Sequence, residues 1–345
     1  MKKIIVVLSL LTCWSFSLSA QALSEPVAII RMGSTKVITQ AMFQEREALV
    51  IGSSGRILSP ADKKSLLNVM IQEELFRQAA SESGIRATED DVMRQFRQSN
   101  PNMSDEQIHQ QAENEYKMPW GKLLKELEAQ LTIQKFLMSQ PDAREMGKGL
   151  DVSDAEVTNF FNDHQAQFVL PDMVRVSNIF FDTTVHPKGT LDEIHQRADK
   201  VLGEIKSGKL TFEEAVRLYS EDPRTAQMNG DMGFVPRDLD SPNFRPIVAL
   251  FGRSFLQELF NLKTGQIKLL ESKAGLHIVK ITDRISRHFL GLDDPIFPGQ
   301  TLTVREYIKQ NLYKEKAMQA QQHFIDKVAD NLKKKADIQI FPQNL

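Results

Sequence analysis

Apolar residues in the first part of the chain recur at helical spacing. The repeating positions are Leu66, Leu67, Met70, Ile71, Leu75 and Ala79. Their three- and four-residue spacing predicts one face of an amphipathic helix, and Gly84 is expected to end it. Upstream, the apolar stretches 27–31 and 36–38 flank Gly33 and Ser34, a pattern that predicts a β-hairpin.

Further helices are indicated by start signals. Thr88 is a cap residue with an acid three positions later, and Ser104 and Ser153 each open a capping box. Pro119 is placed to begin a long helix that carries leucines at helical spacing. Residues 23–170 are therefore predicted to be mostly helical after a short β start.

The pattern changes near residue 171. The expected elements there are a strand at 174–181, helices at 191–206 and 212–219, and a final strand at 276–283. A helical pattern returns over 303–335, and the apolar stretch 338–341 is expected to be a strand. The fold class predicted for the whole chain is α+β.

The N-terminus has the pattern of an export signal. Two lysines follow Met1, and the apolar run 4–11 comes next. Ala20 and Ala22 are the small residues that a signal peptidase requires. The apolar run is shorter than the roughly 20 residues that span a bilayer. Residues 1–22 are therefore predicted to be a cleaved signal peptide and the protein to be periplasmic; a buried N-terminal strand is the alternative, but it would bury both lysines.

Cys13 is the chain's one cysteine. Lipid anchoring at Cys13 is an alternative to simple cleavage, although the threonine before it fits a lipoprotein signal poorly. If Cys13 leaves with the signal, the mature chain has no thiol. Disulfides, thiolate metal sites and a cysteine nucleophile are then excluded.

Charge argues against a nucleic-acid partner. The formal net charge of −2 becomes −4 once the two lysines of the signal are removed. Charges of both signs are mixed, whereas nucleic-acid binding usually requires a basic face. The run Lys333–Lys335 is explained by a solvated helix end. The histidines are scattered, so no metal site is expected.

Three motifs in order carry a family resemblance. They are Tyr-Ser-Glu-Asp-Pro at 219–223, Gly-Asp-Met-Gly-Phe at 230–234, and Gly-Leu-His-Ile-Val-Lys at 275–280. Together they resemble the core motifs of parvulin-type peptidyl-prolyl isomerases. The strand at 174–181 would begin such a domain, but Asn178 stands where the family pattern has a histidine.

The resemblance extends to the flanking regions. The β start, the N-terminal helices and the C-terminal helix are similar to the chaperone module of SurA-type periplasmic chaperones, and the lead-in from Ser153 to Phe168 is similar to that of SurA- and PrsA-type proteins. The resemblance implies a helical module built from residues 23–170 and 285–345. A parvulin domain at 171–284, with a small antiparallel-rich sheet flanked by helices, would be inserted between them.

Prolyl isomerisation breaks no bond. The barrier of about 18–20 kcal/mol comes from amide resonance. A catalyst must therefore bind the twisted amide better than either planar form. An apolar pocket for the proline ring and hydrogen bonds suited to the twisted carbonyl are sufficient, so no cofactor or metal is expected.

The resemblance assigns these roles to residues. The catalytic positions are Asp222, His277, Ser272 and Asn178, and the substrate-binding positions are Phe251, Phe255, Met232 and Phe234. Asp222 would face the twisting carbonyl, and His277 and Ser272 would form the hydrogen-bond network behind it. Phe251 and Phe255 would form the aromatic wall of the proline pocket.

Structural explanations compete with each role. Asp222 and the proline after it are common turn residues, and His277 can be a satisfied core histidine. Phe251 and Phe255 can be core residues, because the segment 238–254 is longer than the family usually has.

Asn178 is the main departure from the family. An asparagine cannot take up a proton near neutrality, so a stable domain with reduced isomerase activity is predicted. A periplasmic chaperone for unfolded outer-membrane or secreted proteins is the leading hypothesis. A fully active isomerase and an exported interaction protein without either activity are the alternatives. The sequence also allows a homodimer in which the N- and C-terminal segments pair between chains.

Overall fold

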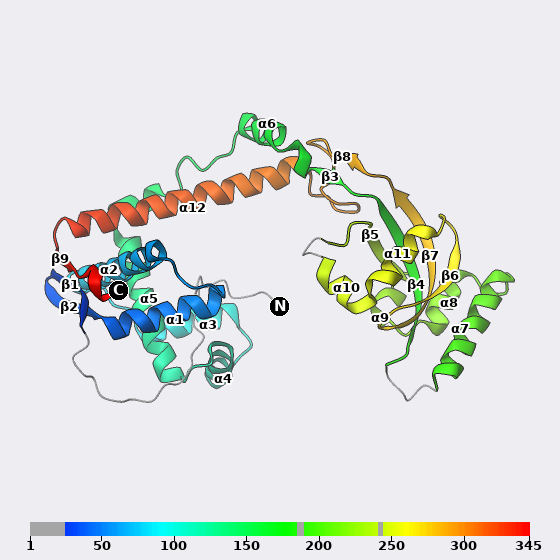
Figure 1. Cartoon of the computed structure of the whole chain (residues 1–345), viewed down its shortest axis with the longest axis horizontal. Coiled ribbons are helices and arrows are strands. Elements are labelled where there is room, and N and C mark those ends of the chain that lie inside the picture. The colour runs from blue at the N-terminus through cyan, green and yellow to red at the C-terminus, as the bar shows by residue number, and fades with distance from the viewer. Residues whose placement is uncertain (1–24, 185–189, 241–243) are drawn as a thin grey trace. The chain divides into compact units, whose positions relative to one another are not determined.

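A computed structural model describes residues 25–184, 190–240 and 244–345 (Figure 1). The expected signal peptide and Cys13 lie outside the described residues. The chain forms two compact units. The first combines residues up to Asp151 with Lys314–Leu345, and the second comprises Val152–Tyr313.

The first unit is mainly helical. Its elements are β1 (Pro26–Met32), β2 (Ser34–Thr39), α1 (Gln40–Ser54), α2 (Pro60–Glu82), α3 (Glu89–Ser99), α4 (Asp105–Tyr116), α5 (Trp120–Ser139), a 3-10 turn (Pro141–Glu145), most of α12 (Val304–Lys333) and β9 (Asp337–Ile340). The strands form one antiparallel sheet in the order β2-β1-β9. Ala28 of β1 pairs with Ile340 of β9, so the two ends of the unit are joined by backbone hydrogen bonds.

Side-chain caps set most helix starts in this unit. Capping boxes occur at Ser59, Thr88 and Ser104, and the boxes predicted at Thr88 and Ser104 are confirmed. In each box the cap oxygen and the third helical residue satisfy two backbone donors that the helix leaves free. The predicted hairpin is confirmed as β1 and β2. The predicted helix before Gly84 is α2, which ends at Glu82.

Two apolar cores support the first unit. One is formed where α2 packs against β1, α5 and the end of α12, with Leu67, Leu75 and Phe324 buried in it. The other lies among α3, α4 and α5 and includes Val92 and Leu123. The apolar spacing read from the sequence corresponds to the buried face of α2.

The second unit contains a four-stranded sheet. Its elements are α6 (Asp154–Asp163), a 3-10 turn (Gln165–Gln167), β3 (Val169–Leu170), β4 (Met173–Asp182), α7 (Leu191–Lys206), α8 (Phe212–Tyr219), α9 (Pro223–Ala226), β5 (Asp231–Pro236), α10 (Arg245–Phe251), α11 (Arg253–Asn261), β6 (Ile267–Glu271), β7 (Gly275–Ile285), β8 (His288–Phe289) and the start of α12. The sheet order is β5-β4-β7-β6, and all its pairings are antiparallel.

Helices cover both faces of this sheet. One face packs against α7 and α8 through Ile179, Phe181, Leu276 and Ile278. The other face packs against α11, with Val176, Val279 and Phe255 buried between them. Because side chains alternate along a strand, Asn178, Phe180 and His277 lie on this second face.

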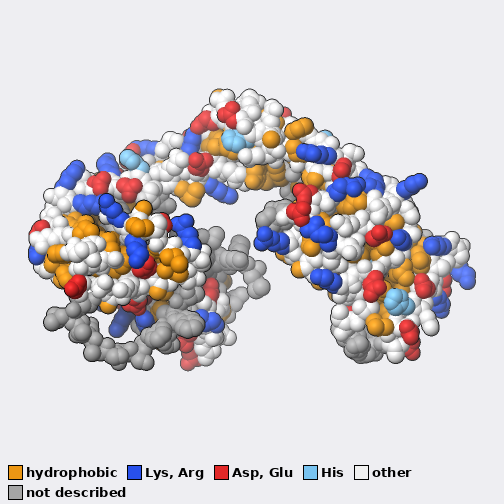
Figure 2. Space-filling model, viewed as in Figure 1, with side chains coloured by type: hydrophobic (Ala, Val, Ile, Leu, Met, Phe, Trp, Pro, Cys, Tyr) orange, Lys and Arg blue, Asp and Glu red, His pale blue; other side chains and the backbone are white. Residues whose placement is uncertain are grey.

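The predicted α+β class is confirmed. The box at Ser153 opens α6 as predicted, whereas α10 and α11 were not predicted. Among the described residues, no helix combines the length and apolar character needed to cross a bilayer. On the face shown in Figure 2, basic and acidic side chains are interspersed.

Candidate active site

The pairing of β4 with β7 brings two of the predicted site residues onto neighbouring strands. Phe180 lies opposite His277, and Asn178 lies opposite Val279. Residues opposite each other in an antiparallel pair point to the same face. Asn178 and His277 are therefore diagonal neighbours on the face that α11 covers, at the polar end of an otherwise apolar core.

The segment after α8 is fixed to the end of β4. The backbone N–H of Glu221 donates to the carbonyl of Phe180 at 2.8 Å, and the N–H of Phe180 donates to Ser220 Oγ at 3.2 Å. The Glu221 carboxylate accepts from the N–H of Asp182 at 2.8 Å. These bonds hold the segment against β4 and so fix the position of the next residue, Asp222.

Asp222 caps the short helix α9. Its Oδ2 accepts a hydrogen bond from Thr225 Oγ1 at 2.7 Å, and its Oδ1 accepts from the N–H of Arg224 at 3.1 Å. The Arg224 guanidinium is 3.8 Å from Oδ2. The side chain is 24% exposed, so part of the carboxylate stays accessible although both of its oxygens accept hydrogen bonds. Asp222 therefore serves as a turn residue whose carboxylate is partly open to solvent.

Gly230 packs directly against the backbone of Asn178. The Asn178 N–H donates to the Gly230 carbonyl at 2.9 Å. Gly230 has a φ of +81°, and a Cβ there would lie 2.5 Å from the Asn178 carbonyl oxygen. Only glycine fits this close approach without strain. Gly275 is under the same restriction, because a Cβ would clash with the carbonyl of Phe181.

His277 is almost completely buried, with 1% of its surface exposed. Its Nε2 lies 2.8 Å from Ser272 Oγ, which also accepts from the N–H of Ala274 at 3.0 Å. Burial lowers the pKa of His277 to about 4, because the charged imidazolium would lose its hydration; the negative charge of Asp222 opposes part of this shift. His277 is therefore neutral at neutral pH.

Three aromatic rings enclose the imidazole. The ring centroids of Phe255, Phe180 and Phe251 lie 4.8, 4.9 and 5.6 Å from that of His277. Phe251 comes from the end of α10 and Phe255 from α11, and their rings are 5.6 Å apart. Phe255 is buried and Phe251 is half-buried. The residues expected to wall a proline pocket thus lie against the histidine.

The two remaining substrate-binding candidates, Met232 and Phe234, pack in different apolar cores. Met232 packs against the core that contains Phe255. Phe234 packs instead in a different core with Phe168, and the Arg175 guanidinium lies 5.7 Å from its ring centroid. The structure brings Met232 toward the aromatic residues of the site and does not bring Phe234 there.

Asn178 is also buried, with 2% of its surface exposed. Its side-chain Oδ1 and the Nδ1 of His277 are both buried without a hydrogen-bond partner in the described structure. Unpaired buried polar atoms destabilise a fold. The end of the core that holds Asn178 and His277 is therefore a weak point of the site, because two of its buried polar atoms make no hydrogen bond.

Sequence reasoning missed four residues that shape the site: Phe180, Ser220, Glu221 and Thr225. Phe180 follows Asn178 by two positions, so the strand period would have placed it on the same face. Ser220 and Glu221 stood inside a recognised motif, but their bonds to β4 are long-range. Thr225 is buried and donates a hydrogen bond to Asp222. The one sequence signal for this contact is that Thr225 follows the cap residue Asp222 by three positions.

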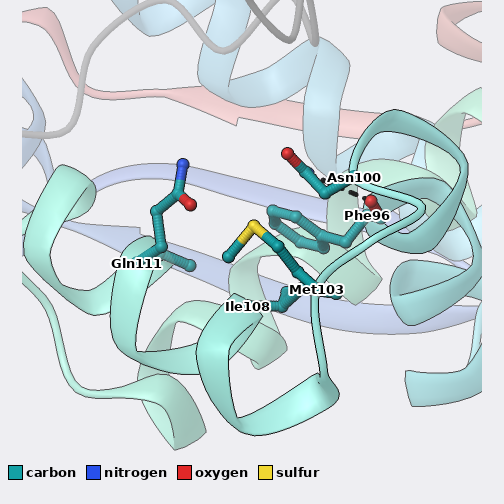
Figure 3. A pocket seen from close by; sticks show the side chains of 6 residues that line it. Phe96, Asn100, Met103, Ile108 and Gln111 are labelled. Atoms are coloured by element: carbon teal, nitrogen blue, oxygen red, sulfur yellow. Dashed lines mark hydrogen bonds between the residues drawn. The ribbon is translucent and has the colours of Figure 1, made fainter.

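Other candidate sites are weak. Within residues 25–184, 190–240 and 244–345, no group of three or more His, Cys, Asp or Glu side chains is placed to hold a metal ion. A small hollow in the first unit has a cavity volume of about 10 Å³, which is room for about one water molecule. As Figure 3 shows, Phe96, Met103 and Ile108 line it, with Asn100 and Gln111 beside them.

The sequence of this region matches a known family. Residues 162–285 match the PPIC-type PPIase domain. This part of the chain, which contains the aromatic enclosure of His277 and the Asp222 loop, is therefore a parvulin-type domain of that family.

Curated relatives match a part of the chain. The chaperone SurA of Salmonella choleraesuis is 33% identical over 88 residues, which are 25% of this chain and 18% of that protein. The chain thus matches about a fifth of the length of these curated relatives. The chain is therefore similar to the chaperone SurA over this stretch of 88 residues and to the PPIC-type PPIase domain over residues 162–285.

Solved structures show weaker likeness. One, from work on the SurA-like chaperones PEB4 and Cj1289 of Campylobacter jejuni, is 15% identical, covers 91% of this chain and 99% of its own, and has a TM-score of 0.37. The peptidylprolyl isomerase PrsA of Bacillus anthracis is 18% identical, covers 78% and 96%, and has a TM-score of 0.25.

Proposed function

We propose that this chain is an exported periplasmic chaperone that binds unfolded outer-membrane or secreted proteins. Its parvulin-type domain (residues 171–284) acts mainly as a binding arm with weak isomerase activity. The chaperone module is formed by residues 23–170 with 285–345. The observation that carries the proposal is Asn178, which occupies the buried position beside His277 where the family pattern has a histidine.

The site can bind proline without performing efficient turnover. The half-buried ring of Phe251, backed by the buried ring of Phe255, offers an apolar wall for the pyrrolidine ring, and a proline-containing segment gains affinity by covering the exposed part of Phe251. The partly exposed carboxylate of Asp222 is held by Thr225 and by the backbone of Arg224, and its negative charge acts on His277. A negative charge there disfavours a planar, partly negative carbonyl oxygen and favours the twisted amide, in which that charge is smaller.

The network behind Asp222 supports catalysis poorly. A second imidazole at position 178 would share a proton with His277 and adjust its polarity during rotation. Asn178 offers a fixed acceptor and a fixed donor only. Rate acceleration depends on interactions that strengthen in the transition state. A network that cannot adjust therefore binds the proline-containing segment but accelerates its isomerisation little.

The first unit supplies surfaces for unfolded chains. Large apolar side chains are exposed on it, including Met42, Ile57, Val69 and Met138. Ile57 is 85% exposed. Figure 2 shows apolar side chains between charged ones on the visible face of this unit. Flexible methionine side chains adapt to varied partners, which suits a chaperone with many clients.

A paired assay tests the proposal. The full chain is tested for suppression of aggregation of an unfolded outer-membrane protein and for acceleration of a proline-limited refolding reaction. Strong suppression with little acceleration is expected. Acceleration typical of an efficient isomerase without suppression would refute the proposal.

A fully active isomerase is the second candidate. It is supported by the contacts of His277 with Ser272, Phe251 and Phe255 and by the charge of Asp222 that acts on the imidazole. The variant Asn178→His separates the two hypotheses. A clear gain in refolding acceleration supports an impaired native site, whereas an unchanged high rate supports an active one.

A homodimer is a further proposal. The pairing of β1 with β9 joins segments more than 300 residues apart in sequence. The same pairing can be made between two chains that exchange C-terminal segments. Light scattering of the purified chain gives its mass, and the mass of one chain would exclude the exchange.

A further inference from the structure

Two buried polar atoms of complementary chemistry lie on one face of the sheet. The Oδ1 atom of Asn178 and the Nδ1 atom of His277 are both buried and unpaired in the described structure. Their residues are diagonal neighbours on β4 and β7. Diagonal neighbours of this kind are about 7–8 Å apart at their backbones, within reach of long or aromatic side chains.

The contacts of Ser272 restrict the protonation of His277. The Ser272 hydroxyl already accepts a hydrogen bond from the N–H of Ala274, and its own hydrogen remains free to donate. His277 Nε2 lies 2.8 Å away. If the hydroxyl donates to Nε2, the imidazole carries its proton on Nδ1, and that N–H requires an acceptor. Asn178 Oδ1 is such an acceptor, because it is buried and receives no hydrogen bond in the described structure.

We propose that Asn178 is a positioning residue that accepts a hydrogen bond from the Nδ1–H of His277 and holds the imidazole in this one neutral tautomer. This inference rests on the proposed function, because it concerns the same site. After a side-chain rotation the Nδ1–H of His277 donates directly to Oδ1 of Asn178, or one bridging water links the two atoms. Ser272 then orients one side of the ring and Asn178 the other.

A fixed tautomer makes the site insensitive to moderate changes of pH. Asn178 does not titrate, and the residues packed on the ring from β4, α10 and α11 are phenylalanines. The negative charge of Asp222 acts on the imidazole, and the Arg224 guanidinium lies 3.8 Å from the Asp222 carboxylate.

The tautomer can be read directly by NMR. The full chain is labelled with ¹⁵N-histidine, and the ring nitrogens of His277 are assigned by the loss of their signals in His277→Gln. The expected result is a protonated Nδ1, an unprotonated Nε2 and no titration between pH 5 and pH 8. A proton on Nε2 in the wild-type protein would overturn the inference without any variant.

Two variants test the role of Asn178. Asn178→Asp keeps the size and the acceptor but adds a charge, so the Nδ1–H tautomer should persist and the pKa of His277 should rise by about one unit or more. Asn178→Leu removes the acceptor and should give a mixture of tautomers. Gln257→Glu adds the same charge at an exposed position of α11 and should change neither signal.

These results are independent of the chaperone proposal, because no client or turnover enters the measurement. If Asn178→Leu retains a pure Nδ1–H tautomer, Asn178 has no positioning role and the inference fails. If the tautomer is as expected but aggregation is not suppressed, the inference stands and the chaperone proposal fails.

Discussion

Gly230 offers a sharp test of how the site is assembled. Gly230 and Gly208 have similar left-handed conformations, with φ of +81° and +76°. A Cβ at Gly208 would meet no atom within 4 Å, whereas a Cβ at Gly230 would lie 2.5 Å from the carbonyl oxygen of Asn178. The pair Gly230→Ala and Gly208→Ala therefore separates the conformational cost from the steric cost.

The magnitudes follow from these contacts. Each substitution costs about 1–2 kcal/mol, because an L-residue is strained in the left-handed region. Gly230→Ala also pushes against backbone and breaks the 2.9 Å bond from the Asn178 N–H. An unsatisfied buried N–H costs about 1–3 kcal/mol. Gly230→Ala is therefore expected to destabilise the second unit by about 2–4 kcal/mol more than Gly208→Ala.

Hydrogen exchange followed by mass spectrometry measures this difference locally. Peptides that cover residues 174–181 should lose protection strongly in Gly230→Ala and only slightly in Gly208→Ala. Peptides from β1 and α2 in the first unit serve as an internal control and should be unchanged. Equal loss of protection in the two variants would refute the close approach of Gly230 to Asn178.

Three further predictions concern the same site. The free energy of unfolding of the second unit should be largest above pH 6.5 and fall by about 3 kcal/mol as the pH drops through about 4, because the unfolded state protonates His277 more readily. In urea titrations, the free energy of unfolding should fall less steeply with pH in His277→Gln than in the wild-type protein. An identical pH dependence in the two proteins would count against a buried neutral histidine. Ser272→Ala should lower stability by about 1–3 kcal/mol, since it leaves Nε2 unpaired, while the exposed control Ser254→Ala should have little effect by the same titration. Asn178→His should speed proline-limited refolding, and no gain would contradict the explanation of weak activity.

Local signals in the sequence were sufficient for much of the fold. The caps at Thr88, Ser104 and Ser153 are formed by side chains next to the bonds they make, so their helices could be predicted. The helices α10 and α11 have no side-chain cap at Phe244 or Gly252. They lacked the cap signal that predicted the helices at Thr88, Ser104 and Ser153.

The site was predictable only in part. The family resemblance predicted that Asp222, His277 and the two phenylalanines share one site. The separation of Met232 from Phe234 was not predictable, because residues two apart in a regular strand share a face. The pairing of β4 with β5 shifts register after Val176, and such a bulge redirects side chains. The unpaired atoms at Asn178 and His277 likewise depend on packing between distant segments.

Suppression of aggregation is the direct test of whether the chain acts as a chaperone. An outer-membrane protein unfolded in urea is diluted into buffer with or without the full chain, and light scattering follows its aggregation. We expect suppression at near-stoichiometric amounts, to the same extent in the wild-type protein and in Asp222→Asn. Absence of suppression, or its loss in Asp222→Asn, would contradict a chaperone whose function does not depend on isomerase turnover.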